Sequence, residues 1–235
     1  MPRFFCTEPV EPSITLALDA RVAQHVRVLR LREGEAITLF DGSGGETSAT
    51  LTQIDKRTVE VTTGERLNIE RELAMQITIC AALIANDRMD WMIQKACELG
   101  VSAIRPMLTE RSQRIPGDIG KRVEHWRGVL IAACEQSGRN QIPEICAPIT
   151  LAEALSSLGD QSTVLLDAEG STAASSIATD SVSIFVGPEG GFAPAELELL
   201  RKRCDHRLRI GRTVLRAETA AVSAIAALAS LASLT

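Results

Sequence analysis

The chain has 235 residues, of which 45% are hydrophobic and 23% are charged, as in an ordinary globular protein. This length fits a small domain joined to a medium one. The formal net charge of -5 argues against a protein that coats nucleic acid nonspecifically, because such proteins are strongly basic.

The first 71 residues predict short strands and one helix. Asp19 is placed to cap a helix whose apolar face is Val22, Val26 and Leu29. Strands are expected at residues 36–40, 47–54 and 58–61. Because a glycine-rich turn separates the first two of these strands, we expect a small β-barrel over residues 1–71.

From residue 72 onward, strand patterns alternate with helix patterns. Strands are expected at residues 75–84, 101–108, 163–167, 182–186 and 207–210. Helices are expected at residues 88–99, 121–135 and 150–159, from Pro194 onward, and at 217–234. This alternation predicts an α/β domain with a mainly parallel sheet over residues 72–235.

Nothing in the chain is typical of export, of a membrane span or of a metal site. The N-terminus lacks a basic region followed by an apolar stretch, and the apolar stretch at 217–234 carries Glu218 among many small residues. The 6 cysteines form no Cys-x-x-Cys pair and the 3 histidines lie far apart. We therefore expect a cytoplasmic protein with reduced core cysteines, no membrane contact and no metal.

Two glycine-rich segments follow predicted strands, at residues 186–192 and 210–219. In parallel sheets, ligands bind beyond the carboxyl ends of the strands, and glycine lets the backbone approach a ligand closely. Ordinary βα turns are the alternative interpretation. Neither segment contains GxGxxG or GxxxxGK followed by Ser or Thr, which disfavours a dinucleotide or nucleoside-triphosphate site.

A polar cluster of Arg216, Glu218 and Thr219 stands where the apolar C-terminal helix begins. A helix N-terminus favours Glu218 electrostatically, and Thr219 is a capping residue, so both have a structural explanation. Arg216 has none, because a cation is disfavoured at that end of a helix. We expect Arg216 to be either paired or facing a substrate.

Two short stretches are basic although the chain as a whole is acidic. Residues 201–216 hold seven Lys or Arg against one acidic residue, and residues 21–32 hold four Arg together with His25. Each stretch alone is explained as well by a solvated charged face. Two of them in an acidic protein favour localised contacts with phosphates.

Residues 185–192 (FVGPEGGF) and 210–220 (IGRTVLRAETA) resemble the two signature segments of the 16S (small-subunit) ribosomal RNA uracil-N3 methyltransferases, in the SPOUT superfamily. The similarity continues in order through residues 2–5, 25–30, 40–42, 93–101, 109–112 and 133–139. The two C-terminal segments are the specific part of the match. The other matches add support chiefly through their order.

The resemblance implies a PUA-like RNA-binding barrel at residues 1–71 and a SPOUT methyltransferase domain with a deep trefoil knot at 72–235. It implies a homodimer that uses S-adenosylmethionine to methylate N3 of a specific uridine in 16S ribosomal RNA, as naked RNA or within the small subunit. The cofactor-binding residues that it implies are Leu166, Gly187, Glu189, Gly190, Ile210, Gly211, Leu215 and Thr219.

Methylation of N3 removes a weakly acidic proton and leaves negative charge on the uracil. Arg216 is our candidate for stabilising that charge, since arginine stays protonated and donates in a planar fork. Glu218 or Glu189 is the candidate proton acceptor, with solvent as the alternative.

Contacts with the RNA are expected at the N-terminal domain. The candidates for phosphate contact are Arg3, His25, Arg27 and Arg30. The candidates for base stacking are Phe4, Phe5 and Phe40, with the barrel core as the alternative place for all three.

Two stretches depart from the family pattern. Residues 86–88 stand where relatives commonly have a lysine or glycine-lysine turn, and residues 166–170 lie in a variable stretch, which leaves Asp167 and Glu169 without a transferred role. Three other functions stay open: methylation of a ribose 2′-hydroxyl or another base, a non-catalytic RNA-binding or assembly factor, and a nucleotide-dependent α/β enzyme.

Overall fold

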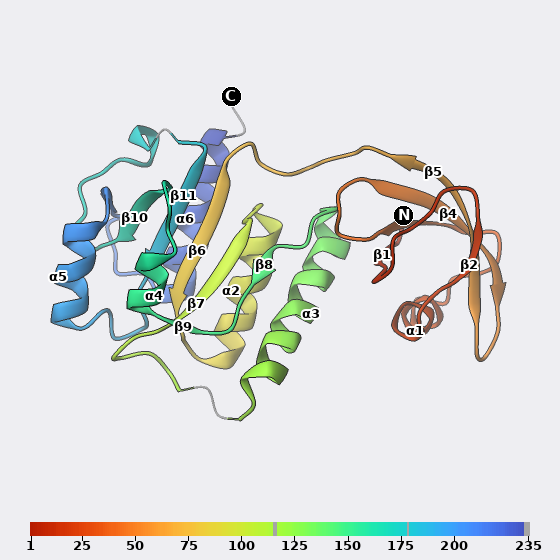
Figure 1. Ribbon diagram of the computed structural model, residues 1–235, viewed down its shortest axis with the longest axis horizontal. Helices are drawn as coiled ribbons and strands as arrows, with labels where there is room; N and C mark the ends of the chain where they lie inside the picture. Colours follow the sequence, from red (N-terminus) through yellow and green to blue (C-terminus); the bar gives the residue numbers. More distant parts are fainter. Residues whose placement is uncertain (115–116, 178, 233–235) are drawn as a thin grey trace. The chain divides into compact units, whose positions relative to one another are not determined.

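The computed structural model describes residues 1–114, 117–177 and 179–232. The chain forms two compact units (Figure 1): unit 1 comprises Met1–Glu72 and Cys134–Ile142, and unit 2 comprises Leu73–Ala133 and Pro143–Thr235. The sequence pattern assigns everything after residue 71 to the second domain, so the inclusion of residues 134–142 in unit 1 is a difference. Residues 134–142 belong to unit 1 because Asn140 is bound there: its side chain donates hydrogen bonds to Glu46 and to the Ile69 carbonyl.

Unit 1 is a five-stranded sheet with one helix. Its elements are β1 (Arg3–Phe5), β2 (Thr15–Ala17), α1 (Ala20–Val28), β3 (Ala36–Phe40), β4 (Glu46–Ile54) and β5 (Val59–Leu67). The strands pair in the order β1-β3-β4-β5-β2, with β1 parallel to β3 and the other pairs antiparallel. The expected strands at 36–40 and 47–54 are confirmed, whereas β5 runs six residues further than residues 58–61 predict.

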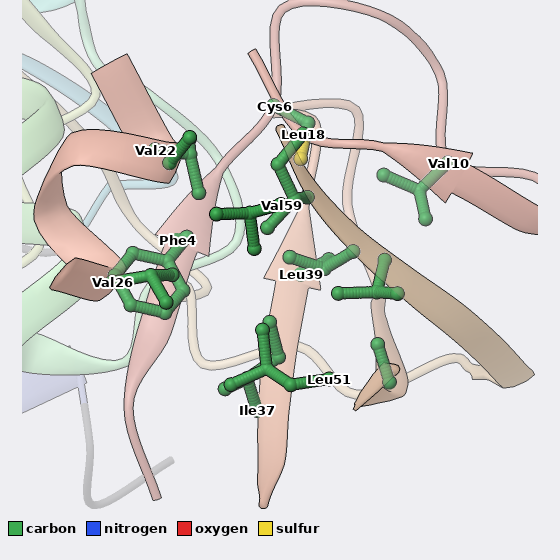
Figure 2. Close-up of a cluster of buried hydrophobic side chains, with 13 residues drawn as sticks. Phe4, Cys6, Val10, Leu18, Val22, Val26, Ile37, Leu39, Leu51 and Val59 are labelled. Atoms are coloured by element: carbon green, nitrogen blue, oxygen red, sulfur yellow. The ribbon is translucent and has the colours of Figure 1, made fainter. Parts of the chain in front are cut away.

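The core of unit 1 lies between α1 and the strands, where Figure 2 shows Val22 and Val26 of the helix beside Phe4 of β1. Asp19 caps α1 as expected, its Oδ1 accepting a hydrogen bond of 2.8 Å from the Val22 amide. The placement of Leu29 on the apolar face was wrong. The helix ends at Val28, and Leu29 is an exposed C-cap residue.

The three N-terminal phenylalanines are all buried, so of the two interpretations given for them, base stacking and barrel core, the structure supports the core. Phe5 and Phe40 pack edge to face at 5.7 Å between ring centroids, and Phe4 packs in the same way on His25 at 5.2 Å. A buried ring gains more from the apolar core than from solvent, and it presents no free face to a base.

Unit 2 alternates strands and helices, as expected. Its strands are β6 (Gln76–Ala82), β7 (Ala103–Leu108), β8 (Glu144–Ile145), β9 (Ile149–Thr150), β10 (Ser162–Leu166), β11 (Ser181–Val186) and β12 (His206–Leu208). Its helices are α2 (Asn86–Glu98), α3 (Ile119–Ser137), α4 (Leu151–Ser156), α5 (Pro194–Arg203) and α6 (Ala217–Ala232), with a short 3-10 turn η1 (Ala174–Ser176). The sequence patterns do not predict β8, β9 or η1.

The sheet of unit 2 is parallel throughout, in the order β12-β10-β11-β6-β7-β8, with β9 also pairing β7. Apolar side chains of α4 and α5 form one core cluster with Met107, Leu165 and Phe185 of the strands. The last helix, α6, packs along α2 and contacts β6, β10 and β11, and Figure 1 shows α4 in front of the sheet and α6 behind it. Both faces of the strands are therefore covered, which explains their continuous apolar runs.

Because neighbouring strands are parallel, the carboxyl ends of β6, β10, β11 and β12 lie at one edge of the sheet. Both glycine-rich segments begin at this edge. No helix in the described ranges is long and apolar enough to cross a membrane.

Candidate functional site

A cleft of about 480 Å³ lies at the carboxyl ends of β10, β11 and β12. Its walls are the three loops that follow these strands, at residues 166–168, 186–192 and 208–215, closed by Leu197, Ala217 and Ala220. Six of the eight expected cofactor residues line it: Leu166, Gly187, Glu189, Gly190, Ile210 and Leu215. Gly211 belongs to the same loop without lining the cleft, and Thr219 faces a different pocket.

The loop after β11 is shaped by close packing at Gly187. A Cβ atom at this position would lie 3.1 Å from Cδ2 of Phe192 and 3.2 Å from the Phe192 amide nitrogen. The Gly191 amide donates to the Pro188 carbonyl at 2.8 Å, which closes the turn, and Arg111 donates to the Gly190 carbonyl at 3.0 Å. The loop is therefore fixed by its own backbone and by one side chain from outside.

The loop after β12 begins two residues earlier than predicted, because β12 ends at Leu208 and not at Ile210. Gly211 has a φ of 70°, a left-handed conformation that favours glycine. Arg209 folds back onto its own loop and donates to the carbonyls of Gly211 at 3.1 Å and Arg212 at 3.0 Å. Ile210 is thus held at the cleft by the turn around it.

The loop after β10 is anchored by Asp167, a residue for which the resemblance implied no role. Its carboxylate accepts hydrogen bonds from Arg201 at 2.9 Å and Arg207 at 3.0 Å, and from the Glu169 amide at 3.0 Å. Burial alone would raise the pKa of Asp167, but the hydrogen bonds from Arg201, Glu169 and Arg207 hold that pKa below its usual value. Asp167 thereby fixes the loop that carries Leu166.

A second pocket of about 500 Å³ lies where α2 and α6 begin. Its lining residues are Asp87, Arg88, Trp91, Arg216, Glu218 and Thr219. The two pockets share the segment from 215 to 219, since Leu215 and Ala217 line the cleft while Arg216 and Glu218 line the second pocket.

Arg88 joins the two glycine-rich segments electrostatically. Its Nη1 lies 3.5 Å from Oε1 of Glu189, and its Nε lies 3.9 Å from Oε1 of Glu218. The sequence places Arg88 only in a turn that departs from the family pattern, so its role was missed. Residues 86–88 in fact begin α2, and the position of that helix after β6, at the edge of the sheet where both segments start, brings Arg88 to them.

Glu218 is only 7% exposed, and its Oε2 has no hydrogen-bond partner among the described residues. A buried carboxylate oxygen without a donor is unfavourable, because it has lost its hydration without compensation. Arg216 is exposed, and its side chain makes no hydrogen bond or ion pair with the described parts of the chain. Of the two expectations for Arg216, pairing is not observed, and the side chain faces the second pocket.

The side chains expected to contact phosphates differ in how far they are exposed and already bound. The Arg3 side chain is 12% exposed and is bound to Glu46 at 2.6 Å and to Asn140 at 2.6 Å, so it is a structural ion pair and not an open cation. Arg27 is partly exposed and donates to the Asp55 carbonyl, whereas Arg30 is exposed. His25 lies 3.9 Å from Glu135 and packs on Phe4.

The basic stretch at 201–216 is largely engaged inside unit 2. Arg201 and Arg207 bind Asp167, Lys202 binds Glu198 at 2.6 Å, and Arg209 binds its own loop. Three of the seven basic residues are thus paired with carboxylates, and Arg209 is held by backbone carbonyls. Within the described ranges, no group of three or more His, Cys, Asp or Glu side chains is arranged to hold a metal ion.

Comparison with known proteins supports the geometry. Residues 71–229 match the RNA methyltransferase domain family, and residues 18–63 match the RNA methyltransferase PUA domain. A ribosomal RNA small subunit methyltransferase E from Neisseria gonorrhoeae, solved bound to S-adenosyl methionine, is 34% identical, with a TM-score of 0.92 over 98% of both chains. A putative methyltransferase from Legionella pneumophila, solved with the same cofactor, is 33% identical, with a TM-score of 0.89 over 97% of both chains.

A curated relative, the ribosomal RNA small subunit methyltransferase E of Rickettsia conorii, is 33% identical over 216 residues, which are 89% of this chain and 86% of the relative. The parallel α/β unit with its cleft, together with the PUA domain, defines an RNA methyltransferase. Within that class, the chain belongs to the ribosomal RNA small subunit methyltransferase E family. The family resemblance of the sequence is thereby confirmed.

Proposed function

We propose that this protein uses S-adenosylmethionine to methylate N3 of a specific uridine in 16S ribosomal RNA. The observation that carries the proposal is the pair of pockets that share residues 215–219, one walled by glycine-rich backbone and the other lined by Arg216 and Glu218. Family membership supports an RNA substrate of the small ribosomal subunit.

The cleft fits the cofactor. Its volume of about 480 Å³ is typical of small-ligand sites. Leu166, Ile210 and Leu215 give it apolar walls for an adenine ring, and the loop backbone at Gly187 and Gly190 offers amides and carbonyls for polar edges. When bound there, S-adenosylmethionine supplies an electrophilic methyl group. Both relatives solved with this cofactor cover at least 97% of this chain.

The second pocket supplies the groups that uracil N3 requires. A carboxylate would take the N3 proton, and the electron pair left on nitrogen would form the bond to the methyl carbon as the methyl–sulfur bond breaks, its electrons returning to sulfur and leaving S-adenosylhomocysteine. Glu218 is the better acceptor, because its Oε2 lacks a partner whereas Glu189 already accepts a hydrogen bond of 3.5 Å from the Ala85 amide. Arg216 donates to the uracil oxygens and stabilises the negative charge that develops on them.

The remaining parts of the proposal concern RNA binding, assembly and topology. Residues 1–71 act as a PUA-like RNA-binding domain that presents Arg27 and Arg30, supported by the PUA match. The protein acts in the cytoplasm as a homodimer, consistent with the exposed apolar side chain of Val214 beside the cleft. Sedimentation velocity tests the dimer.

The C-terminal segment passes through a preceding loop to form a deep trefoil knot, as the SPOUT resemblance implies. Membership of the methyltransferase family supports this part of the proposal. Mechanical unfolding from both ends tests it. A knotted chain yields less contour length than its residue number allows, whereas full extension excludes the knot.

Arg216→Ala and Glu218→Gln test the function. We expect both variants to lose most methyl transfer to small ribosomal subunits that lack the modification, while S-adenosylmethionine binding by calorimetry changes little. Arg216→Lys restores part of the activity if positive charge is sufficient. Mass analysis of nucleosides identifies the product. A 2′-O-methyl nucleoside, or normal turnover by Arg216→Ala, contradicts the proposal, and no cofactor binding by the wild type indicates an assembly factor instead.

A further inference from the structure

We propose that the second pocket is the subsite for the target uracil and that Trp91 stacks on the base. This inference rests on the proposed function. It adds where the target uracil binds and which side chains recognise it. Nothing in the sequence patterns drew attention to Trp91, which stands one helical turn after Asp87 on α2.

Trp91 is the one exposed side chain among the Phe and Trp residues of the protein, all of which lie in the described ranges. The chain has no Tyr, five Phe and two Trp, all within the described residues. All five Phe are buried and Trp126 is 1% exposed, whereas Trp91 is 42% exposed and lines the pocket. RNA-modifying proteins stack an unpaired base on an aromatic ring, so only Trp91 is available for this task among Phe, Tyr and Trp.

The polar groups of the pocket match the Watson–Crick edge of uracil. That edge presents O4, N3–H and O2, which are an acceptor, a donor and an acceptor. The pocket holds the complementary groups, since Arg88 and Arg216 are donors and Glu218 is an acceptor. Cytosine has an unprotonated N3, which repels the Glu218 carboxylate, so the same groups discriminate against it.

Glu218 gives independent support for a ligand. The residue is 7% exposed and its Oε2 has no hydrogen-bond partner in the described chain, although the residue lines the pocket. An N–H donor brought by a base satisfies this oxygen. An apolar surface from a second copy of the chain leaves it unsatisfied, which favours a base over a protein interface at this pocket.

Arg88 lies close to one carboxylate of each pocket. It contacts Glu218 of the second pocket at 3.9 Å and Glu189, which lines the cleft, at 3.5 Å. A uracil stacked on Trp91 thus lies at the segment 215–219, which also lines the cofactor cleft. Arg88 is a positioning residue in this arrangement, because it holds the carboxylates on either side.

The test uses Trp91→Ala, Trp91→Phe and the control Leu199→Ala, which removes a similarly exposed apolar side chain from α5. We expect Trp91→Ala to lower kcat/KM for small ribosomal subunits about tenfold, as loss of one stacked base does. Trp91→Phe restores most of it, and Leu199→Ala has no effect. The calorimetric Kd for S-adenosylmethionine stays unchanged in all three, which also shows that they are folded.

Photocrosslinking gives a second readout. The probe is small-subunit RNA in which 5-bromouridine replaces uridine, and we expect the crosslinked peptide to contain Trp91. Unchanged kcat/KM in Trp91→Ala, or crosslinks confined to other peptides, overturns the inference while uridine methylation by the wild type upholds the proposed function. A shift of Trp91→Ala to a smaller species in sedimentation also overturns it, since Trp91 is then an interface residue. Absence of uridine methylation in the wild type overturns the proposed function itself.

Discussion

The ring of Phe192 lies directly against the backbone of Gly187. A Cβ atom at Gly187 would lie 3.1 Å from the ring, closer than an ordinary contact, so the ring would have to shift to admit it. Both residues line the cofactor cleft, so the contact fixes the loop after β11 at the point where a ligand meets it. The close contact with Phe192, and not the backbone conformation, therefore favours glycine here, since its φ is not in the left-handed region.

Gly187→Ala is expected to weaken S-adenosylmethionine binding about tenfold or more, because Phe192 and its loop must move away from the added methyl group. Calorimetry measures the effect. Gly128→Ala on the exposed face of α3 is the control, since a Cβ there meets nothing within 4 Å. Equal affinities of the Gly187→Ala variant and the wild type would show that the loop adapts without cost.

The parallel sheet and the cleft at its edge were predictable, because alternating periodicities and two glycine-rich segments after strands carry that information. The second pocket was not predictable from the sequence. Arg88 and Trp91 belong to an ordinary amphipathic helix pattern, and only the pairing of β6 with β11 brings the start of α2 to the segment after β11. The sequence also could not show which arginines are free to contact phosphates. Arg3 is bound to Glu46, whereas Arg30 is exposed.

Asp167→Asn is expected to destabilise unit 2 and to weaken cofactor binding. The change removes the charge that holds Arg201 and Arg207, and leaves both guanidinium groups without their central partner. Loss of one partner from a largely buried ion pair costs about 3 kcal/mol, and less here because both arginines are about one-third exposed. Urea unfolding measures the stability, and calorimetry measures the cofactor affinity.

The matched control for Asp167→Asn is Glu169→Gln. Glu169 pairs with the same Arg201 at 2.7 Å, but its side chain is 73% exposed. We expect a change in unfolding free energy below about 1 kcal/mol, as for other surface ion pairs. If both variants lose the same stability, Asp167 is not the anchor of the loop.

Arg27 and Arg30 are expected to contact phosphates, whereas Arg3 is not. Replacing both Arg27 and Arg30 with Gln should flatten the dependence of RNA affinity on salt, lowering the slope of log K against log salt by roughly 1.5 for two lost contacts. Filter binding of small-subunit RNA over a salt series measures this slope. Arg3→Gln should leave the slope unchanged and lower the stability of unit 1, since Arg3 is bound to Glu46.

Glu46 makes the stability of unit 1 depend on pH. Burial alone would raise the pKa of Glu46, but hydrogen bonds from Arg71, Arg3 and Asn140 lower it from 4.5 to about 2. The folded state therefore binds fewer protons than the unfolded state between these values. The stabilisation is fully present above pH 4.5 and is lost as the pH falls toward 2.

Glu46→Gln should accordingly destabilise unit 1 by about 2 kcal/mol at pH 7, since each pKa unit corresponds to about 1.4 kcal/mol and solvent screens part of it. The difference from the wild type should shrink steadily below pH 4.5. Hydrogen exchange of β4 peptides in the intact protein, measured across this range, reports on unit 1 alone. Glu65→Gln is the control, because Glu65 is an exposed residue of β5 without an ion pair among the described residues. A difference between Glu46→Gln and the wild type that persists undiminished at pH 2 would mean that shape, and not charge, makes Glu46 stabilising.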